Sequence, residues 1–352
     1  MKKNTSECFA ALRDKLPLDK RRVELLASLL LAILQLNTSN LAKLAPVLDL
    51  KGKKESKYRR LKRFFTDAEI DFDIFAKLLM AIVKPKGKYI LALDRTEWKF
   101  GPVWVNILTL AIVWGNTSIP LFWQTLNRKG NSTLKEKQEI IGRYVKVFGV
   151  ADIEYLSADR EFDGYEVVQY LSREKIPFRL RVKVSMKITD KRGQPIKCGK
   201  LLRTLKIGGS YKLRRGRKYA GVKVYAEVAR GRDSKESIIV ISSQASEQIL
   251  LEYKRRWTIE TLFQNLKSRG FEVEETPVTK AEKIDKLFGV LALGVAWALA
   301  AGAAESVAHP IEIKKNGRPQ QSIFSLGCEI IKEVLFEVQR YSTVNIFAIL
   351  RC

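Results

Sequence analysis

Two aspartates in this sequence stand where buried strands normally end in apolar residues. Asp94 follows the apolar run Tyr89–Leu93, and Asp159 follows the apolar and small residues "YLSA". Two carboxylates held a few ångströms apart repel each other unless a cation lies between them. Mg²⁺ or Mn²⁺ prefers such oxygen ligands, and a pair of these ions stabilises the attacking and leaving oxygens of phosphoryl transfer. The alternative is that each aspartate only caps a turn.

The helix expected at Tyr253–Lys267 offers a third carboxylate. Its sequence, YKRRWTIETLFQNLK, places Tyr253, Arg256, Glu260 and Lys267 at offsets 0, 3, 7 and 14. At roughly 100° per residue, their side chains fall within about 60° of one another. The apolar residues that would seat this helix against a sheet are Ile259, Leu262, Phe263 and Leu266. The alternative is a solvated helix face with an Arg256–Glu260 pair.

The chain is strongly basic, which favours a polyanionic partner. Its 64 Lys and Arg residues exceed the 38 Asp and Glu residues by 26. Residues 179–232 contain eighteen Lys and Arg against Asp190 and Glu227, and residues 51–63 contain eight against Glu55. Each cluster alone could be a solvated face. Two clusters in one chain, the larger interleaved with tyrosines, indicate nucleic acid.

The cysteine and histidine content excludes several classes of site. Cys8, Cys198, Cys328 and Cys352 are far apart in the sequence, so neither a disulfide framework nor a structural zinc site is expected. This usage fits a reducing cytoplasm. His309 is the only histidine, which excludes zincin-type sites and paired-histidine chemistry. Any catalysis therefore depends on carboxylates, Lys, Arg, Tyr or Ser.

One uncharged stretch raises the possibility of a membrane span. Leu287–Ala304 contains no charged residue, but its seven alanines and three glycines make it weakly apolar. A buried core helix is expected there, with a membrane protein built on this segment as the alternative. The first residues lack the apolar run of a signal peptide. We expect a cytoplasmic protein with no membrane partner.

The elements that must position the acids follow the order of a ribonuclease-H-like α/β fold. Residues 88–96, 105–114 and 117–126 predict three antiparallel strands, and a helix, a strand, a helix and a strand follow. In this order the first and fourth strands lie side by side, which places Asp94 next to Asp159. The Gly-rich, alternating residues 186–243 predict an inserted β-subdomain that interrupts this core.

The expected domains follow from these patterns. They are a helical DNA-binding region (1–84), the first part of the catalytic core (85–185), a basic β-insertion (186–243), the second part of the core (244–310) and a C-terminal helical region that could dimerise (311–352).

The N-terminal region is expected to be helical and to bind DNA. Asp19–Asn37 has an N-cap and a long apolar face, and Ser39 is the candidate cap of a short helix. The segment "KYRRLKRFF" predicts a basic amphipathic helix that carries Lys57, Arg60 and Arg63 away from its apolar face. This arrangement is compatible with a helix-turn-helix that reads the major groove, a pattern that many surface helices share.

Taken together, the motifs resemble those of the DDE transposases of bacterial insertion sequences. The resemblance rests on Asp94 in "LALDRTEW", Asp159 in "SADREFDG" and the Tyr-x2-Arg-x3-Glu-x6-Lys string. That string is similar to the mark of the insertion-sequence family numbered four. The resemblance extends from about Tyr89 to Ala304 and includes a β-insertion before the glutamate helix.

The resemblance implies a metal-dependent enzyme of cut-and-paste transposition. Asp94, Asp159 and Glu260 would bind two Mg²⁺ ions, with Mn²⁺ as a possible substitute. The implied steps are a nick at the transposon end, a hairpin and transfer of the 3′ end to target DNA. The implied partners are double-stranded DNA and a second copy of the chain in a synaptic complex. The residues that would hold phosphates near a flipped base are Tyr253, Arg256 and Lys267.

The sequence departs from this family pattern in its tryptophans. Relatives that make hairpins can stack an insertion tryptophan on the flipped base, whereas all six tryptophans here lie outside residues 186–243. Trp257, next to Arg256, is the remaining candidate for stacking on a flipped base.

The alternative function is a non-catalytic DNA-binding regulator or an inactive relative, against which the intact acid triad argues. Arginines expected to contact the DNA backbone from the insertion are Arg214, Arg215 and Arg217.

Overall fold

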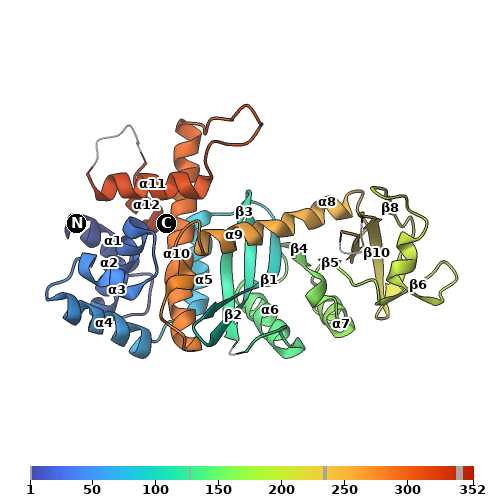
Figure 1. The fold of residues 1–352 in the computed structure, drawn as a ribbon, viewed down its shortest axis with the longest axis horizontal. Coiled ribbons are helices and arrows are strands. Elements are labelled where there is room, and N and C mark those ends of the chain that lie inside the picture. Colours follow the sequence, from blue (N-terminus) through green and yellow to red (C-terminus); the bar gives the residue numbers. More distant parts are fainter. Residues whose placement is uncertain (1, 127, 233–235, 338–343) are drawn as a thin grey trace.

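The chain is arranged along one long axis. The N-terminal helices lie at one end, the central sheet in the middle and the strands of residues 186–243 at the other end (Figure 1). The structure is a computed structural model that describes residues 2–126, 128–232, 236–337 and 344–352.

The N-terminal region is helical, as the sequence predicts. The helix expected at Asp19–Asn37 begins after Asp19, whose side chain accepts the Arg22 N–H at 3.0 Å, and ends at Asn37. The Ser39 cap is wrong, because Asn40 accepts the Ala42 N–H while Ser39 is buried. The helices are α1 (Lys2–Leu12), α2 (Lys20–Leu36), α3 (Leu41–Leu44), the 3-10 turn η1 (Ala45–Val47), α4 (Lys54–Asp67) and α5 (Phe72–Val83).

The central elements follow the predicted order of strands and helices. The sheet order is β3-β2-β1-β4-β5-β11-β10-β8; β4 lies parallel to both β1 and β5, and the other pairs on this path are antiparallel. This mostly antiparallel α/β arrangement is compatible with the predicted ribonuclease-H-like core. The elements are β1 (Tyr89–Phe100), β2 (Val103–Trp114), β3 (Thr117–Leu126), α6 (Leu134–Phe148), β4 (Ile153–Ala158), α7 (Tyr165–Arg173) and β5 (Phe178–Arg181).

The first strand is longer than predicted, so Asp94 does not end it. β1 pairs with β4 only as far as Leu93 opposite Ala158, but it pairs with β2 up to Phe100 opposite Val103. The hairpin partner continues to satisfy the backbone of the polar residues after Asp94. Asp94 therefore lies where β1 leaves its parallel neighbour.

The strands expected between residues 186 and 243 are present, and three of them extend the central sheet. β11 pairs with β5, β10 with β11 and β8 with β10, so these three strands continue the central sheet. Only β6 and β7 form a separate two-stranded sheet in the described part of the chain. The strands are β6 (Lys187–Thr189), β7 (Pro195–Lys197), β8 (Ser210–Lys212), β9 (Arg217–Tyr219), β10 (Val222–Ala229) and β11 (Ile238–Ser242), with the 3-10 turn η3 (Cys198–Leu202).

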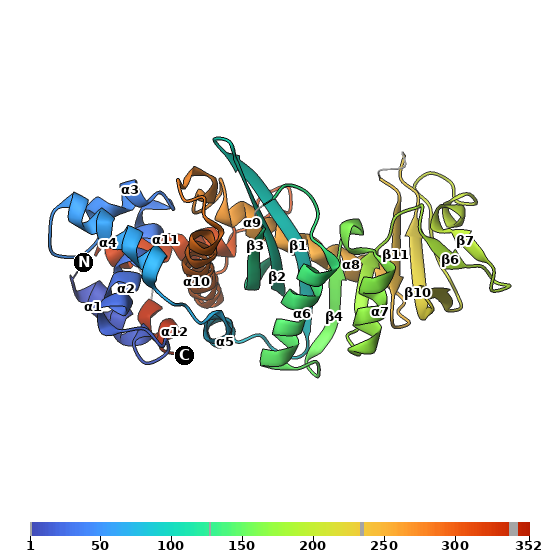
Figure 2. The same ribbon diagram turned by 90° about the horizontal axis from the view of Figure 1, so that it is seen from below.

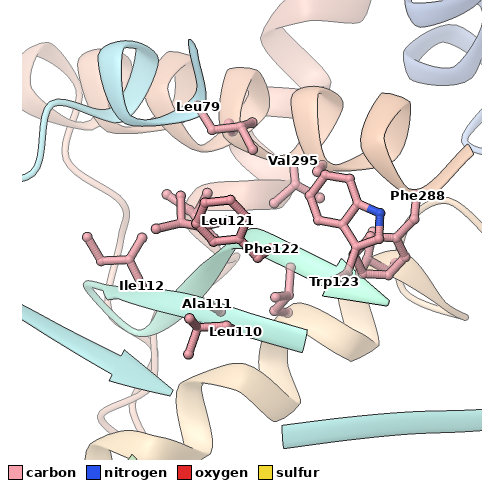
Figure 3. Packing of buried hydrophobic residues seen from close by; sticks show 14 of the residues in the cluster. Leu79, Leu110, Ala111, Ile112, Leu121, Phe122, Trp123, Phe288 and Val295 are labelled. Atoms are coloured by element: carbon pink, nitrogen blue, oxygen red, sulfur yellow. The ribbon is translucent and has the colours of Figure 1, made fainter. Parts of the chain in front are cut away.

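Helices cover both faces of the central sheet (Figure 2). Consecutive residues of a strand point to opposite faces. In β3, Phe122 packs edge-on against Tyr144 of α6, whereas the Trp123 ring centroid lies 5.2 Å from that of Phe288 in α10 (Ala281–Ala308). Figure 3 shows Trp123 of β3 close to Phe288 and Val295, which both belong to α10. The sheet is therefore held from both sides near its strand ends.

The uncharged stretch forms the buried core helix that the sequence predicts. Among the described residues, α10 is the one unbroken helix long and apolar enough to cross a membrane, and 83% of its most apolar window is buried inside the protein. Asp285 fixes α10 to β3 by accepting hydrogen bonds from the Thr125 N–H at 2.9 Å and the Thr125 hydroxyl at 2.7 Å.

The C-terminal helices pack on this core. α11 (Ile323–Leu335) crosses α10 with the two backbones in contact, and α12 (Ile346–Arg351) lies against α1. A β-carbon at Gly327 would overlap the carbonyl oxygen of Ala298, and one at Gly302 would overlap the carbonyl oxygen of Ile323. Only glycine permits this close approach.

We predict that Gly302→Ala and Gly327→Ala each lower the free energy of unfolding by about 1–3 kcal/mol, because the added methyl group forces the helices apart. Gly142→Ala is the matched control. A β-carbon at Gly142 in α6 would meet only the Tyr170 hydroxyl, at 3.4 Å, and alanine favours the helix. Urea unfolding followed by circular dichroism measures all three variants. Equal stability of Gly327→Ala and Gly142→Ala would contradict the close crossing.

Candidate active site

Parallel pairing of β1 with β4 brings the two aspartates together. Leu93 pairs with Ala158, and each is followed directly by its aspartate. Asp94 remains in β1, while Asp159 precedes the 3-10 turn η2 (Arg160–Phe162). The predicted neighbourhood of the first and fourth strands is confirmed by this register.

A single buried arginine joins the acidic residues. One terminal nitrogen of Arg256 lies 2.6 Å from Asp94 Oδ2, and the other lies 2.9 Å from Glu260 Oε1. The Arg256 side chain is 4% exposed, whereas that of Glu260 is 54% exposed. The Arg256 charge therefore lies at the bottom of the site, and Glu260 lies at its solvent side.

Tyr253 extends this network to the second aspartate. Arg256 Nε donates to the Tyr253 hydroxyl at 3.1 Å, and that hydroxyl donates to Asp159 Oδ1 at 3.2 Å. Arg181 at the end of β5 also approaches Asp159 Oδ1, at 3.5 Å. Asp94, Asp159 and Glu260 are thus gathered around Arg256 and Tyr253.

Burial and charge act differently on the two aspartates. Burial raises the pKa of Asp94 to about 6, because the nearby Arg256 offsets only part of the cost of desolvating the carboxylate. Burial also acts to raise the pKa of Asp159, but the Arg160 N–H and the guanidinium groups of Arg256 and Arg181 outweigh it and lower this pKa. Burial acts to lower the pKa of Arg256, but Tyr253 and the carboxylates of Asp94 and Asp159 raise it above its ordinary value.

The helix that carries Glu260 is not continuous, contrary to the prediction. α8 (Ile249–Lys254) and α9 (Thr258–Leu266) are joined by the 3-10 turn η4 (Arg255–Trp257). The tighter turn still leaves Arg256 in contact with both Tyr253 and Glu260. The Thr258 hydroxyl, 2.7 Å from the Ser118 hydroxyl of β3, fixes the start of α9.

The predicted apolar flank of α9 is confirmed. Its four members pack in the main core against the sheet, and all are buried: Ile259, Leu262, Phe263 and Leu266. This packing fixes the rotation of α9 and so the direction of Glu260.

Lys267 does not join the acid cluster. It ends α9, with φ −94° and ψ −132°, so the helical offset used in the prediction no longer applies. Its ammonium group donates to the Glu97 carbonyl at 3.0 Å and pairs with Glu274 at 2.9 Å. It also lies over the Trp98 ring, beside the part of β1 beyond Asp94.

Arg95 and Glu161 are contributors that the sequence analysis missed. Arg95 Nε and a terminal nitrogen donate to the two Glu161 oxygens at 3.1 and 3.0 Å, so the residues after each aspartate are paired. Glu161 also acts to raise the pKa of Asp94. A repeated pattern in the sequence could have indicated them, because each aspartate is followed directly by an arginine and then by a glutamate within three residues.

The acids suit a hard divalent cation in their chemistry, since carboxylate oxygens are the ligands that Mg²⁺ prefers. Their arrangement differs from the expected cage, because Arg256 lies between Asp94 and Glu260. Among the residues that the structure describes, no group of three His, Cys, Asp or Glu side chains is placed to hold a metal ion.

The remaining candidate DNA-binding residues make no contact with the three acids in the described part of the chain. Trp257 on η4 is 57% exposed. Arg214 and Arg215 are exposed in the turn between β8 and β9, whereas Arg217 is half-buried in β9. These arginines belong to the end of the chain opposite the N-terminal helices (Figure 1).

On α4, the three predicted contacts separate into two kinds. Lys57 is half-buried and donates to the Leu48 carbonyl at 2.6 Å, so it has a structural role in holding the preceding loop. Arg60 and Arg63 are exposed.

Comparison with known proteins gives a family match. The family model described as the transposase DDE domain matches residues 85–295. No curated protein matches the chain. Since the family match covers more than half of the chain and contains Asp94, Asp159 and Glu260, this chain belongs to the DDE transposase family.

Proposed function

We propose that this transposase cuts and joins DNA at the cluster of Asp94, Asp159 and Glu260. The observation that supports this site is the convergence of the three acids, from β1, the end of β4 and α9, on Arg256 and Tyr253. If the acids only balanced the charge of Arg256, three of them from three different elements would not be needed. The non-catalytic regulator is the less favoured alternative, because nothing in its function would need this convergence.

Asp94, Asp159 and Glu260 would hold Mg²⁺, with Mn²⁺ as a substitute. When bound, the metal would supply charge stabilisation for the attacking and leaving oxygens of a phosphodiester. The pKa of Asp159 is lowered, so this residue offers a carboxylate over the whole neutral range. Arg256 would have to give up part of its bonding to Asp94 or Glu260 for these oxygens to serve as ligands.

Arg256 and Tyr253 would position the DNA backbone beside the acids. A guanidinium group binds a phosphate through two parallel hydrogen bonds, and a phenol adds a third donor. Trp257, 57% exposed on the next residue, offers a ring on which an unstacked base could pack. Lys267, which lies beside Glu97 of β1, would contact the DNA backbone farther from the acids.

Several finer features belong to the same proposal. The Tyr-Arg-Glu-Lys string supports membership of insertion-sequence family four and cut-and-paste transposition with a hairpin intermediate, and the widely spaced cysteines support a cytoplasmic location. The N-terminal helices and Arg214, Arg215 and Arg217 would bind double-stranded DNA, and two copies of the chain would hold paired ends. The domain limits given by the sequence stay a prediction. α11 packs on α10, so any role in dimerisation would use its exposed side.

We expect Asp94→Asn, Asp159→Asn and Glu260→Gln each to reduce cleavage by at least about 100-fold, because each removes charge stabilisation from the reacting phosphate. DNA binding and thermal stability should change little, since the amides keep the shape of the acids. Glu154→Gln, on the exposed side of β4, is the matched control and should cleave normally. The assay uses a labelled duplex that carries the terminal repeat of the element, with Mg²⁺ or Mn²⁺.

Cleavage by Asp159→Asn at the rate of the unmodified protein would falsify the triad. Mn²⁺ binding followed by electron paramagnetic resonance gives a second measurement. It should weaken in Asp94→Asn and stay unchanged in Glu154→Gln.

We predict that Arg256→Ala separates nicking from hairpin formation. The first nick needs only a positioned phosphate and the acids, whereas a hairpin needs a sharply bent strand and an unstacked base, at a cost of a few kcal/mol. Arg256→Ala should keep some first-strand nicking and lose most hairpin product, while Tyr253→Ala shows a milder loss. Arg255→Ala, on the same turn, is the control. Denaturing gels resolve the two products.

Equal loss of nicks and hairpins in Arg256→Ala would mean that Arg256 positions the scissile phosphate at every step. Double-strand breaks without any hairpin in the unmodified protein would rule out the hairpin pathway.

A further inference from the structure

A groove of about 600 Å³ between α2 and α4 is lined by four arginines. Arg21 and Arg22 come from the first turn of α2, and Arg60 and Arg63 come from α4, one helical turn apart. Two apolar residues, Leu25 and Phe64, are buried beneath them. Both helices are anchored in the main core, so the groove has rigid walls.

Three of these four arginines have no partner for their guanidinium groups in the described part of the chain. Arg22 is engaged, since it pairs with Asp19 at 3.3 Å and donates to the Asp67 carbonyl at 3.2 Å. For Arg21, Arg60 and Arg63, the described part of the chain shows no ion pair and no side-chain hydrogen bond. Like charges gathered on one groove repel one another until an anion lies between them.

The groove is cationic even though two acids line it. Glu24 and Asp67 stand against four arginines, which leaves a formal charge of +2 (four minus two). Guanidinium groups bind phosphate in a planar, two-pronged geometry. The apolar floor suits the sugar face between successive phosphates better than it suits a free, fully hydrated anion.

The outer side of α4 offers a different surface. Arg59 and Lys62 are exposed there and do not line the groove. Lys62 lies over the ring of Tyr58, 4.8 Å from its centroid. A helix that entered the major groove would use such outward residues to reach base edges.

We propose that the α2–α4 groove binds the phosphate backbone of duplex DNA through Arg21, Arg60 and Arg63. The DNA then lies along the groove, and α4 supports it from the side instead of entering the major groove. This assignment rests on the proposed function, which supplies DNA as the substrate. It adds Arg21, a residue outside the basic segment 51–63, and it removes Lys57 from the contact.

The test compares two double variants of the full chain with equal loss of charge. Arg21→Gln/Arg60→Gln changes groove residues, and Lys20→Gln/Arg59→Gln changes their immediate neighbours on the same two helices, outside the groove. Fluorescence anisotropy measures binding to a labelled random-sequence duplex over a series of salt concentrations. Thermal melting checks that both variants fold, and Arg63→Gln alone provides a second groove variant.

The groove variant should bind the duplex at least about tenfold more weakly at physiological salt. The slope of the logarithm of its binding constant against the logarithm of the salt concentration should become shallower by about two, one unit for each lost phosphate contact. Arg63→Gln should lower the slope by about one. The neighbour variant should keep both affinity and slope.

Equal losses in the two double variants, or no loss in the groove variant, overturn the groove assignment and leave the transposase proposal intact. Failure of the unmodified protein to bind duplex DNA at all would overturn both. The same titration with a labelled single strand is the last comparison, and a loss seen with the single strand but not with the duplex would overturn the assignment of a duplex ligand.

Discussion

The candidate site depends on one buried cation. Arg256 holds Asp94 and Glu260 directly and reaches Asp159 through the hydroxyl of Tyr253. Without that charge, the carboxylates of Asp94 and Asp159, which are both largely shielded from water, would repel each other and favour protonation. The raised pKa of Asp94 shows that even with Arg256 the desolvation of this carboxylate is only partly offset. The strands and α9 place the acids, and Arg256 balances their charge.

The fold supplies the acids from elements that are distant in sequence and fixed independently. Parallel pairing of β1 with β4 sets the positions of Asp94 and Asp159, and the burial of the apolar side of α9 sets that of Glu260. Asp285 and the aromatic contacts of Trp123 hold α10 against β3, behind these strands. Each contribution is a packing or pairing constraint with its own residues, so the site does not rely on a single loop.

The sequence predicts the order of the elements and the meeting of the two aspartates, because apolar runs and strand order carry that information locally. It does not predict the 3-10 turn at Arg255–Trp257, since three residues without glycine or proline give no local signal for a tighter turn. The extension of β1 past Asp94 was equally hidden, because the hairpin partner β2 supplies its hydrogen bonds. The bond between Arg256 and Asp94 joins residues 162 positions apart and exists only in the folded chain.

The unbroken sheet also has a mechanical meaning. Hydrogen-bonded strands run from β3 through β1, β4 and β5 to β11, β10 and β8. A ladder of this kind resists shear, so a load applied at the basic strands β8 to β10 is carried by backbone bonds to the strands that hold Asp94 and Asp159. A separate subdomain on a tether would dissipate that load in its linker. In this chain, three residue pairs between β5 and β11 and three between β4 and β5 join the distal strands to those that carry the two aspartates.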